Sequence, residues 1–264
     1  MLGFIGTGNM ASAIIKGAVS SEFLKGNEIC VYDKDREKAE ALSDIYGVYV
    51  CESEKEVCEN AQQIILSVKP NVLEGVFSCV KETLKEKNPL IISIAAGKSL
   101  SFLKENADYD ARIIRVMPNI NAVVLEAISA YCPNENADKD DMLFAEGLLS
   151  SFGKAVRIEE DKFSVFTAIG GCSPAFSYMY IDALARAGVK NGLPKSVALE
   201  VAAQAVFGSA KMIAESDAHP YELVDRVCSP GGTTIEGVAS LQRDGFEAAV
   251  AAAVEAAINK DKRM

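Results

Sequence analysis

The chain begins MLGFIGTGNMASAIIKG (residues 1–17), a short apolar run followed by two glycines that one residue separates. Residues 2–5 predict a strand and residues 9–20 predict a helix, so the glycines lie at a turn between the two. This is the context of the dinucleotide-binding fingerprint. Gly6 allows the tight turn, Gly8 lets the backbone approach a pyrophosphate, and Ala11 takes the third small position. The alternative is an ordinary strand–helix turn.

The helix that follows adds to this interpretation. Its N-terminus, from Thr7 through Asn9 and Met10, offers free amides and a partial positive charge to phosphate groups. We therefore expect residues 6–10 to bind a nicotinamide dinucleotide.

The first 158 residues alternate short β-branched runs with helical patterns. We expect strands at residues 2–5, 29–32, 48–50, 64–68, 90–94, 113–117, 128–132 and 154–158. We expect helices at residues 9–20, 35–46, 53–60, 72–84, 99–106 and 138–150. Strands without polar alternation, separated by helical crossovers, indicate a parallel sheet with helices on both faces. Residues 1–158 therefore predict an α/β Rossmann-like dinucleotide-binding domain.

Beyond residue 159 the strand pattern stops. We expect helices at residues 162–187 with a break at GGCSP (170–174), at 194–216 and at 221–227, then two alanine-rich helices up to residue 263. Helices rich in small residues pack closely and suit an intersubunit bundle. Residues 159–264 therefore predict an all-α domain for substrate binding and dimerisation.

Composition excludes several classes of partner and site. The net charge is −10 without a basic cluster, which argues against nucleic acid and anionic membranes. We also expect no membrane span and no signal peptide. Seven scattered cysteines without a C-x-x-C pair are typical of reduced thiols in the cytoplasm. With His219 as the single histidine, we expect no metal site and no histidine-based triad.

Three segments at the ends of expected strands extend the expected cofactor path. Asp33, at the end of the second strand, can accept both ribose hydroxyls and repel a 2′-phosphate, which favours NADH. Lys34 and Arg36 could bind a phosphate if Asp33 turns aside, and Asp33 could instead cap the next helix. Val68-Lys69-Pro70 and Ala95-Ala96-Gly97 follow the fourth and fifth strands, where ligands of open α/β sheets bind, although each could be an ordinary strand exit.

Two segments of the second half combine glycines with hydroxyl groups before a helix. They are Gly170-Gly171-Cys172-Ser173-Pro174 and Ser229-Pro230-Gly231-Gly232-Thr233-Thr234. Such a segment can form a nest of amides for a carboxylate or phosphate, or it can be a capped turn between packed helices.

These motifs make the chain resemble pyrroline-5-carboxylate reductase from end to end. The resemblance is carried by FIGTGNMA, VKP, AAG, RVMPN, GCSPAF, DALARAGVKNGLP, AAQAVFGSAKM and, most specifically, VCSPGGTTIEGV. It implies a Rossmann-like domain and a helical dimerisation domain, with dimers that assemble further into decamers. It also implies reduction of the C=N bond of Δ1-pyrroline-5-carboxylate to L-proline by NADPH or NADH.

The same resemblance implies roles for the second-half segments. Thr234 would act at the ring nitrogen as donor or proton relay, and Ser229, Gly231, Gly232 and Thr233 would hold the carboxylate. Many members carry serine at Cys172, so neighbouring Ser173 would compensate. Many members also bind the 2′-phosphate of NADPH with a small polar or basic residue at the position that Asp33 occupies here, and with an asparagine near the position of Ser53 and Glu54. In this chain both positions are acidic, Asp33 and Glu54, which favours NADH, whereas most members of the family use NADPH.

Two alternative functions remain at this point. A β-hydroxyacid dehydrogenase shares the domain layout, but the lysine of its helical motif is missing after Gly171, where the next lysine is Lys190. A non-catalytic nicotinamide-binding sensor is the other alternative, and the intact SPGGTT segment argues against it.

Overall fold

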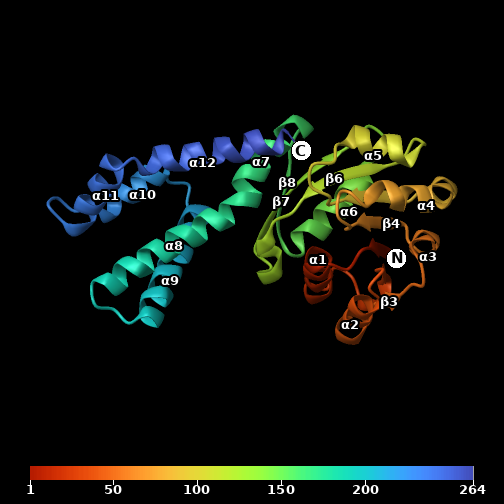
Figure 1. Ribbon diagram of the computed structural model, residues 1–264, viewed down its shortest axis with the longest axis horizontal. Helices are drawn as coiled ribbons and strands as arrows, with labels where there is room; N and C mark the ends of the chain where they lie inside the picture. Colours follow the sequence, from red (N-terminus) through yellow and green to blue (C-terminus); the bar gives the residue numbers. More distant parts are fainter. Residues whose placement is uncertain (264) are drawn as a thin grey trace. The chain divides into compact units, whose positions relative to one another are not determined.

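The computed structural model describes residues 1–263, which form two compact units (Figure 1). One unit comprises residues 1–171 together with the end of the chain from Ile258, and the other comprises Cys172–Ala257. The domain boundary expected after residue 158 stays a prediction.

The first unit is built on an eight-stranded sheet with the order β3-β2-β1-β4-β5-β6-β7-β8. The strands are β1 Leu2–Ile5, β2 Ile29–Tyr32, β3 Tyr49–Val50, β4 Gln63–Leu66, β5 Leu90–Ser93, β6 Ile113–Met117, β7 Ala127–Pro133 and β8 Gly153–Arg157. The order reverses between β1 and β4, as in dinucleotide-binding sheets. The Rossmann-like fold is confirmed.

The last two strands of the sheet, β7 and β8, run opposite to the other six, which departs from the expected parallel sheet. β7 runs antiparallel to β6, whereas every other neighbouring pair is parallel. The connection between them contains one 3₁₀ turn, Ile120–Val124, and is too short for the crossover that a parallel pair requires. The all-parallel prediction was wrong at this edge.

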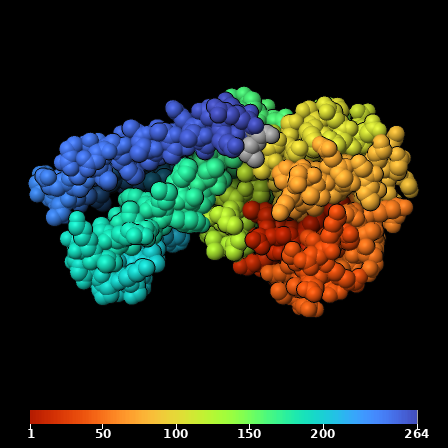
Figure 2. Space-filling view, viewed as in Figure 1, coloured from red at the N-terminus to blue at the C-terminus, as the bar shows by residue number. Residues whose placement is uncertain are grey.

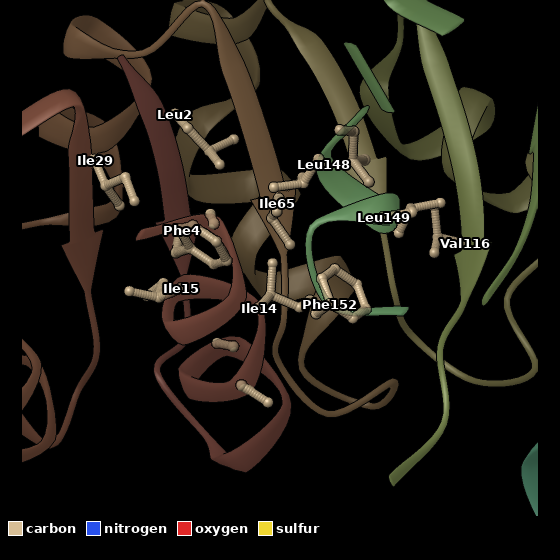
Figure 3. Close-up of a cluster of buried hydrophobic side chains, with 14 of the residues drawn as sticks. Leu2, Phe4, Ile14, Ile15, Ile29, Ile65, Val116, Leu148, Leu149 and Phe152 are labelled. Carbon is tan, nitrogen blue, oxygen red and sulfur yellow. The ribbon is translucent and has the colours of Figure 1, made fainter. Parts of the chain in front are cut away.

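Helices cover both faces of the sheet. They are α1 Asn9–Ser20, α2 Arg36–Tyr46, α3 Glu54–Asn60, α4 Leu73–Lys87, α5 Leu100–Ala107, α6 Lys139–Ser150 and α7 Phe163–Phe166. Alternate residues of β1 show how the sheet divides the core: Leu2 and Phe4 pack with α1 and α6 (Figure 3), whereas Ile5 packs with α3 and α4. Each strand therefore contributes apolar side chains to both layers, which explains why it lacks polar alternation.

The second half is helical, as expected. A π-helical turn, Thr167–Cys172, leads into α8 Ser173–Lys190, α9 Lys195–Glu215, α10 Pro220–Val227, α11 Thr233–Arg243 and α12 Phe246–Asp261. The expected break at GGCSP was wrong, because the chain remains helical through these residues. Pro174 lies in the first turn of α8, where the fixed φ of proline suits an α-helix.

The helices of the second unit leave much apolar surface open. Its buried cluster contains only three alanines, Ala185, Ala198 and Ala202. Exposed side chains include Tyr178, Met179 and Phe207, and Figure 2 shows these helices, coloured cyan to blue, with much of their surface open. By length and composition alone, α9 is also apolar enough to cross a membrane, with a mean hydropathy of 1.4. The expectation of no membrane span stays a prediction.

Candidate active site

A cavity of about 280 Å³ lies where the carboxyl ends of β1, β2 and β4 meet. This is the point at which the strand order reverses, and ligands of open α/β sheets bind there. The cavity is lined by Ile5, Gly6, Gly8, Tyr32, Asp33, Lys34, Lys38, Glu54, Ser67, Val68, Lys69, Val72 and Val76. Seven expected cofactor residues thus come together: Gly6, Gly8, Asp33, Lys34, Glu54, Val68 and Lys69.

The glycine loop has the geometry that the sequence implied. Gly6 has a φ of +98°, and a Cβ there would lie 2.8 Å from the carbonyl oxygen of Ser67. A Cβ at Gly8, by contrast, would meet nothing within 4 Å, so the backbone is open on that side. Helix α1 begins after Gly8 with no side-chain cap and no acidic residue in its first turn. Its first amides therefore suit a pyrophosphate.

Asp33 is bound to the glycine loop itself. Its Oδ2 accepts hydrogen bonds from the amide (2.7 Å) and the Oγ1 (3.0 Å) of Thr7, and its Oδ1 accepts one from the amide of Asp35 (3.0 Å). Each carboxylate oxygen offers about two acceptor positions, so Oδ2 is filled and one position remains on Oδ1. Asp33 is therefore left with capacity for one ribose hydroxyl, fewer than the two expected.

The protonation of Asp33 follows from the same contacts. Partial burial works toward a higher pKa, but the hydrogen bonds from Thr7 and Asp35 outweigh it and lower the pKa of Asp33 below its ordinary value. Asp33 is therefore a carboxylate at neutral pH. The interpretation of Asp33 as the cap of the next helix was wrong, because α2 begins at Arg36 with Asp35 at its N-cap position; Asp33 binds the amide of Asp35, which lies before the helix.

The charges around the cavity nearly balance. Three ammonium groups, of Lys34, Lys38 and Lys69, stand against the two carboxylates of Asp33 and Glu54. Arg36 is occupied elsewhere, since its guanidinium pairs with Glu40 (2.7 Å) and Glu52 (2.6 Å). Lys38 pairs with Asp35 at 3.0 Å, so Lys34 and Lys69 are the lining cations without a carboxylate partner among the described residues.

The remaining expected cofactor residues lie outside this cavity. Thr7 and Asn9 line a second hollow, which shares Gly8 and Lys38 with the first. Met10 packs against the core. Pro70 follows Val68 and Lys69, while Ala95, Ala96 and Gly97 follow β5, with Ala95 buried and Gly97 at a φ of +72°.

Sequence reasoning missed three polar residues of the lining, Tyr32, Lys38 and Ser67. Ser67 donates its hydroxyl to the carbonyl oxygens of Gly6 (2.6 Å) and Ile5 (3.0 Å), which fixes the loop against β4. Burial, followed by the charges of Glu54 and Asp33, raises the pKa of Tyr32, which therefore stays a neutral phenol. The sequence did contain a signal for Lys38, because it lies in the first turn of the helix that follows Asp33 and so near the expected cofactor site.

The SPGGTT segment forms a turn that opens α11. Gly231 has a φ of +68°, and the amide of Gly232 donates to the carbonyl oxygen of Ser229 at 3.0 Å. Gly232 precedes the helix without a side-chain cap, so Thr233 and Thr234, both exposed, form an uncapped N-terminal turn. Such a turn presents amides and hydroxyls to an anion.

Cys172 and Ser173 lie at the junction of the π-helical turn and α8, and both are half-buried. Within residues 1–263, no hydrogen bond joins this pair to residues 229–234 of the same chain. The two segments expected to bind the substrate therefore lie on different helices, one at the start of α8 and one at the start of α11.

Comparison with known proteins decides the family. Residues 160–264 match the model for pyrroline-5-carboxylate reductase dimerisation, and residues 1–97 match the model for NADP oxidoreductase, coenzyme F420-dependent. The pyrroline-5-carboxylate reductase of Escherichia coli is 40% identical over 263 residues, covering 100% of this chain and 97% of that protein. The chain belongs to the pyrroline-5-carboxylate reductase family.

Solved structures agree with this membership. The reductase of Coxiella burnetii has a TM-score of 0.95 at 30% identity and covers 99% of this chain and 97% of its own. A Plasmodium falciparum pyrroline carboxylate reductase with NADP bound has a TM-score of 0.88 at 32% identity, covering 99% and 97%. The resemblance is confirmed, and neither the β-hydroxyacid dehydrogenase nor the sensor is favoured.

Metal ligands form no recognisable site in the part of the chain that the structure describes, where no three His, Cys, Asp or Glu side chains group together. Four of the seven cysteines are buried, and all seven are free thiols. His219 binds its own backbone, accepting the amide of Tyr221 on Nδ1 at 3.2 Å.

Proposed function

We propose that this reductase holds Δ1-pyrroline-5-carboxylate on its SPGGTT segment and the nicotinamide cofactor on its glycine loop, and that Thr234 serves the ring nitrogen. As a member of its family, the protein is an NAD(P)H-dependent oxidoreductase that converts the substrate to L-proline in proline biosynthesis. The end-to-end match to the family, which includes the whole SPGGTT segment, carries this conclusion.

The cofactor fits the first unit on physical grounds. Gly6 and Gly8 bring the backbone close to the pyrophosphate, and the first turn of α1 supplies amides without a competing side-chain cap. When bound, the cofactor supplies the hydride that the C5 carbon of the substrate ring accepts. Val68, Lys69, Pro70, Ala95, Ala96 and Gly97 would follow the cofactor along the strand ends.

The substrate requires anion binding and one proton at nitrogen. As C5 is reduced, the π electrons of the C=N bond pass to the nitrogen, which finishes as the amine of proline. Thr234 would donate a hydrogen bond to this nitrogen or relay its proton. The amides of Gly231, Gly232 and Thr233, with the hydroxyl of Ser229, would hold the substrate carboxylate, and Cys172 and Ser173 would contact the ring. His219 is not needed, since it caps α10.

We propose that both NADH and NADPH are used, with a modest preference between them. Asp33 and Glu54 disfavour a 2′-phosphate, which leans toward NADH. Lys34, Lys38 and Lys69 offset them, and the Thr7 contacts leave Asp33 capacity for one ribose hydroxyl. The catalytic efficiencies with the two cofactors should therefore differ by no more than about tenfold, or roughly 1.4 kcal/mol.

The match to a dimerisation domain supports oligomers built through the second half of the chain. We propose a homodimer that assembles further into a decamer and works in the cytoplasm, without a nucleic-acid or membrane partner. The exposed apolar side chains of α8 and α9 supply the surface that a dimer would bury.

The test is oxidation of NADH and NADPH, measured in parallel at 340 nm, with Δ1-pyrroline-5-carboxylate as acceptor. Turnover with either cofactor is the expected result. Thr234→Ala should lower kcat about a hundredfold, while Thr234→Ser retains the hydroxyl and most of the rate. Both variants should bind NADPH as the wild type does. Folded wild-type protein that binds NADPH yet gives no turnover would favour the sensor, and full activity of Thr234→Ala would remove the role of Thr234.

A further inference from the structure

The π-helical turn Thr167–Cys172 is a rare conformation in which each carbonyl pairs five residues ahead. It runs from α7 directly into α8, and it ends at Cys172, next to Ser173. Because a π turn inserts one residue into an α-helix, every residue after it is rotated by about 100° from its α-helical direction. The π turn therefore sets where Cys172 and Ser173 point.

Pro174 removes one amide donor that this turn would use in the α-helical register. In an α-helix the carbonyl of Gly170 would pair with the nitrogen of residue 174, which is Pro174 and carries no hydrogen. Gly170 is buried, so water cannot take the place of that donor. In that register the carbonyl needs a donor from outside the helix.

Asn119 supplies that donor. Its Nδ2 donates to the carbonyl oxygen of Gly170 at 2.9 Å, and its Oδ1 accepts the amide of Ile128 at 3.4 Å. Asn119 is only 5% exposed and comes from the segment that follows β6, 51 residues earlier in the chain. One side-chain amide therefore joins the end of β6, the start of β7 and the π turn.

Close packing holds the turn in the same place. A Cβ at Gly170 would lie 2.9 Å from the ring of Phe166, and a Cβ at Gly171 would lie 3.4 Å from the Cε of Met117. The two glycines therefore let the turn approach its own preceding helix and the last residue of β6. A larger residue at Gly170 would push the turn away from Asn119.

Arg115 of β6 holds the chain at the start of α7, the helix that precedes the π turn. Arg115 pairs with Glu160 at 2.8 Å, and its guanidinium lies 4.3 Å from the ring centre of Phe163. Glu160 also accepts the amide of Leu100 at 2.7 Å. With α7 fixed in this way, the Asn119 contact decides the conformation of the residues between α7 and α8.

We propose that Asn119 is a positioning residue of the reductase: by pairing with the Gly170 carbonyl it holds the π turn that aims Cys172 and Ser173 at the substrate. The naming of the substrate rests on the proposed function above. Asn119 itself does not contact the reacting atoms in this assignment. Its loss should raise the KM for pyrroline-5-carboxylate and leave NADPH binding intact.

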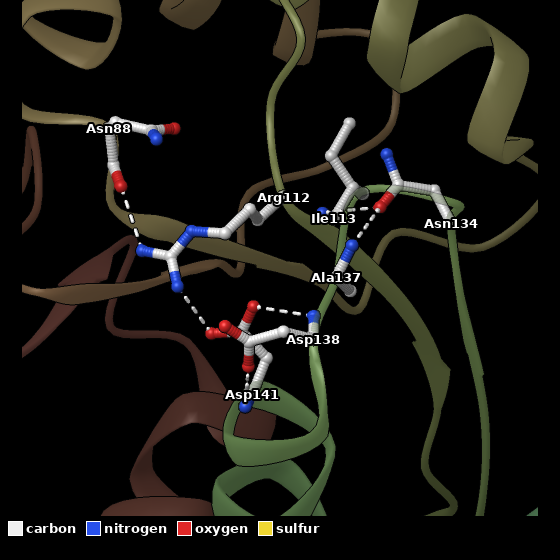
Figure 4. Close-up of polar contacts among 7 residues, drawn as sticks. All are labelled: Asn88, Arg112, Ile113, Asn134, Ala137, Asp138 and Asp141. Carbon is white, nitrogen blue, oxygen red and sulfur yellow. Dashed lines mark hydrogen bonds and ion pairs between the residues drawn. The ribbon is translucent and has the colours of Figure 1, made fainter.

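The experiment compares Asn119→Ala with a matched control, Asn134→Ala. Asn134 is also buried and donates Nδ2 to a backbone carbonyl, that of Ala111, at 2.8 Å, but it follows the last residue of β7. Its Oδ1 accepts the amides of Ile113 (3.0 Å) and Ala137 (3.1 Å) (Figure 4). Both variants should lower the melting temperature. Asn119→Ala should lower kcat/KM for pyrroline-5-carboxylate about tenfold or more, whereas Asn134→Ala should stay within about twofold of wild type.

A double variant separates positioning from stability. Pro174→Ala restores the amide hydrogen that the Gly170 carbonyl lacks, so Asn119→Ala/Pro174→Ala should regain melting temperature while kcat/KM stays low, because the α-helical register replaces the π register. Recovery of kcat/KM along with stability would overturn the positioning role. So would an equal loss of kcat/KM in Asn134→Ala.

Two further readouts keep the outcomes distinct. The dissociation constant of NADPH, from its fluorescence, should change by less than about twofold in Asn119→Ala. Backbone amide exchange over residues 167–173 should become faster in that variant, and unchanged exchange would overturn the proposal. A wild-type protein without turnover would instead refute the proposed function, whatever the variants show.

Discussion

Replacing Asp33 by asparagine should destabilise the glycine loop. Asp33→Asn keeps one acceptor oxygen and places an NH₂ group against an N–H donor, of either Thr7 or Asp35. If the remaining oxygen faces Thr7, its two hydrogen bonds from Thr7 survive and the hydrogen bond from the Asp35 amide is lost. A hydrogen bond to a charged acceptor contributes about 1.5–3 kcal/mol, and the surviving bonds also weaken without the charge. Because Asp33 is partly exposed, we expect a loss of about 2 kcal/mol.

The pH dependence of this loss follows from the lowered pKa of Asp33. A carboxyl whose pKa is lower in the folded state stabilises the fold above its unfolded pKa, near 4, and stops doing so as the pH falls through the folded value. Urea unfolding should therefore show the same gap between wild type and Asp33→Asn at pH 7 and pH 5, and a smaller gap below pH 4. A variant as stable as wild type at pH 7 would refute the reasoning.

The same variant tests how Asp33 acts on the cofactor. Both NADH and NADPH use the loop that Asp33 holds, so Asp33→Asn should weaken both, and the loss of the carboxylate charge should shift their ratio toward NADPH by no more than about tenfold. Glu54→Gln is the matched control, because Glu54 lines the cavity without a hydrogen bond to residues 6–10 in the described chain. It should shift the ratio toward NADPH at unchanged stability. A shift of more than tenfold in Asp33→Asn would show that Asp33 reads the ribose.

Further substitutions test the loop and the core. Gly6→Ala should cost about 1–3 kcal/mol in urea unfolding, because its φ is +98° and the new Cβ would meet Ser67. Gly8→Ala, where a Cβ has room, should fold normally yet weaken NADPH binding in a fluorescence titration; unchanged binding would argue against pyrophosphate at this position. Phe152→Ala should cost about 3–5 kcal/mol in the same unfolding assay, since Phe152 is fully buried between α1 and the sheet, and a loss below 1 kcal/mol would contradict that packing.

Local pattern predicted most of the first unit. The bounds of β1, β2, β6 and α1 agree with expectation to the residue. Their borders carry clear signals: two glycines separate β1 from α1, charged residues flank β2, and an arginine and a proline flank β6. The direction of β7 could not be read in this way, since apolar runs look alike in parallel and antiparallel strands. Only the length of its connection to β6 carried that information.

The features that pattern missed depend on contacts between distant residues. The sequence of the GGCSP segment predicts a break, yet the segment is helical, with Asn119 bonded to the carbonyl of Gly170 and Phe166 packed against that glycine. Asp33 reads as a ribose ligand, but Thr7, 26 residues away, occupies one of its oxygens. These hydrogen-bond partners could not be deduced from local spacing, because they lie 51 and 26 residues away in the chain.

The alanine cluster of the second unit has a consequence for how the enzyme behaves on dilution. Three buried alanines provide little free energy of folding, so the helices from α8 to α12 depend on surface that another subunit covers. Unfolding of this half should then obey mass action, with a melting temperature that rises with protein concentration. At the nanomolar concentrations of an enzyme assay, slow loss of activity should reflect subunits separating, and added cofactor alone should not prevent it.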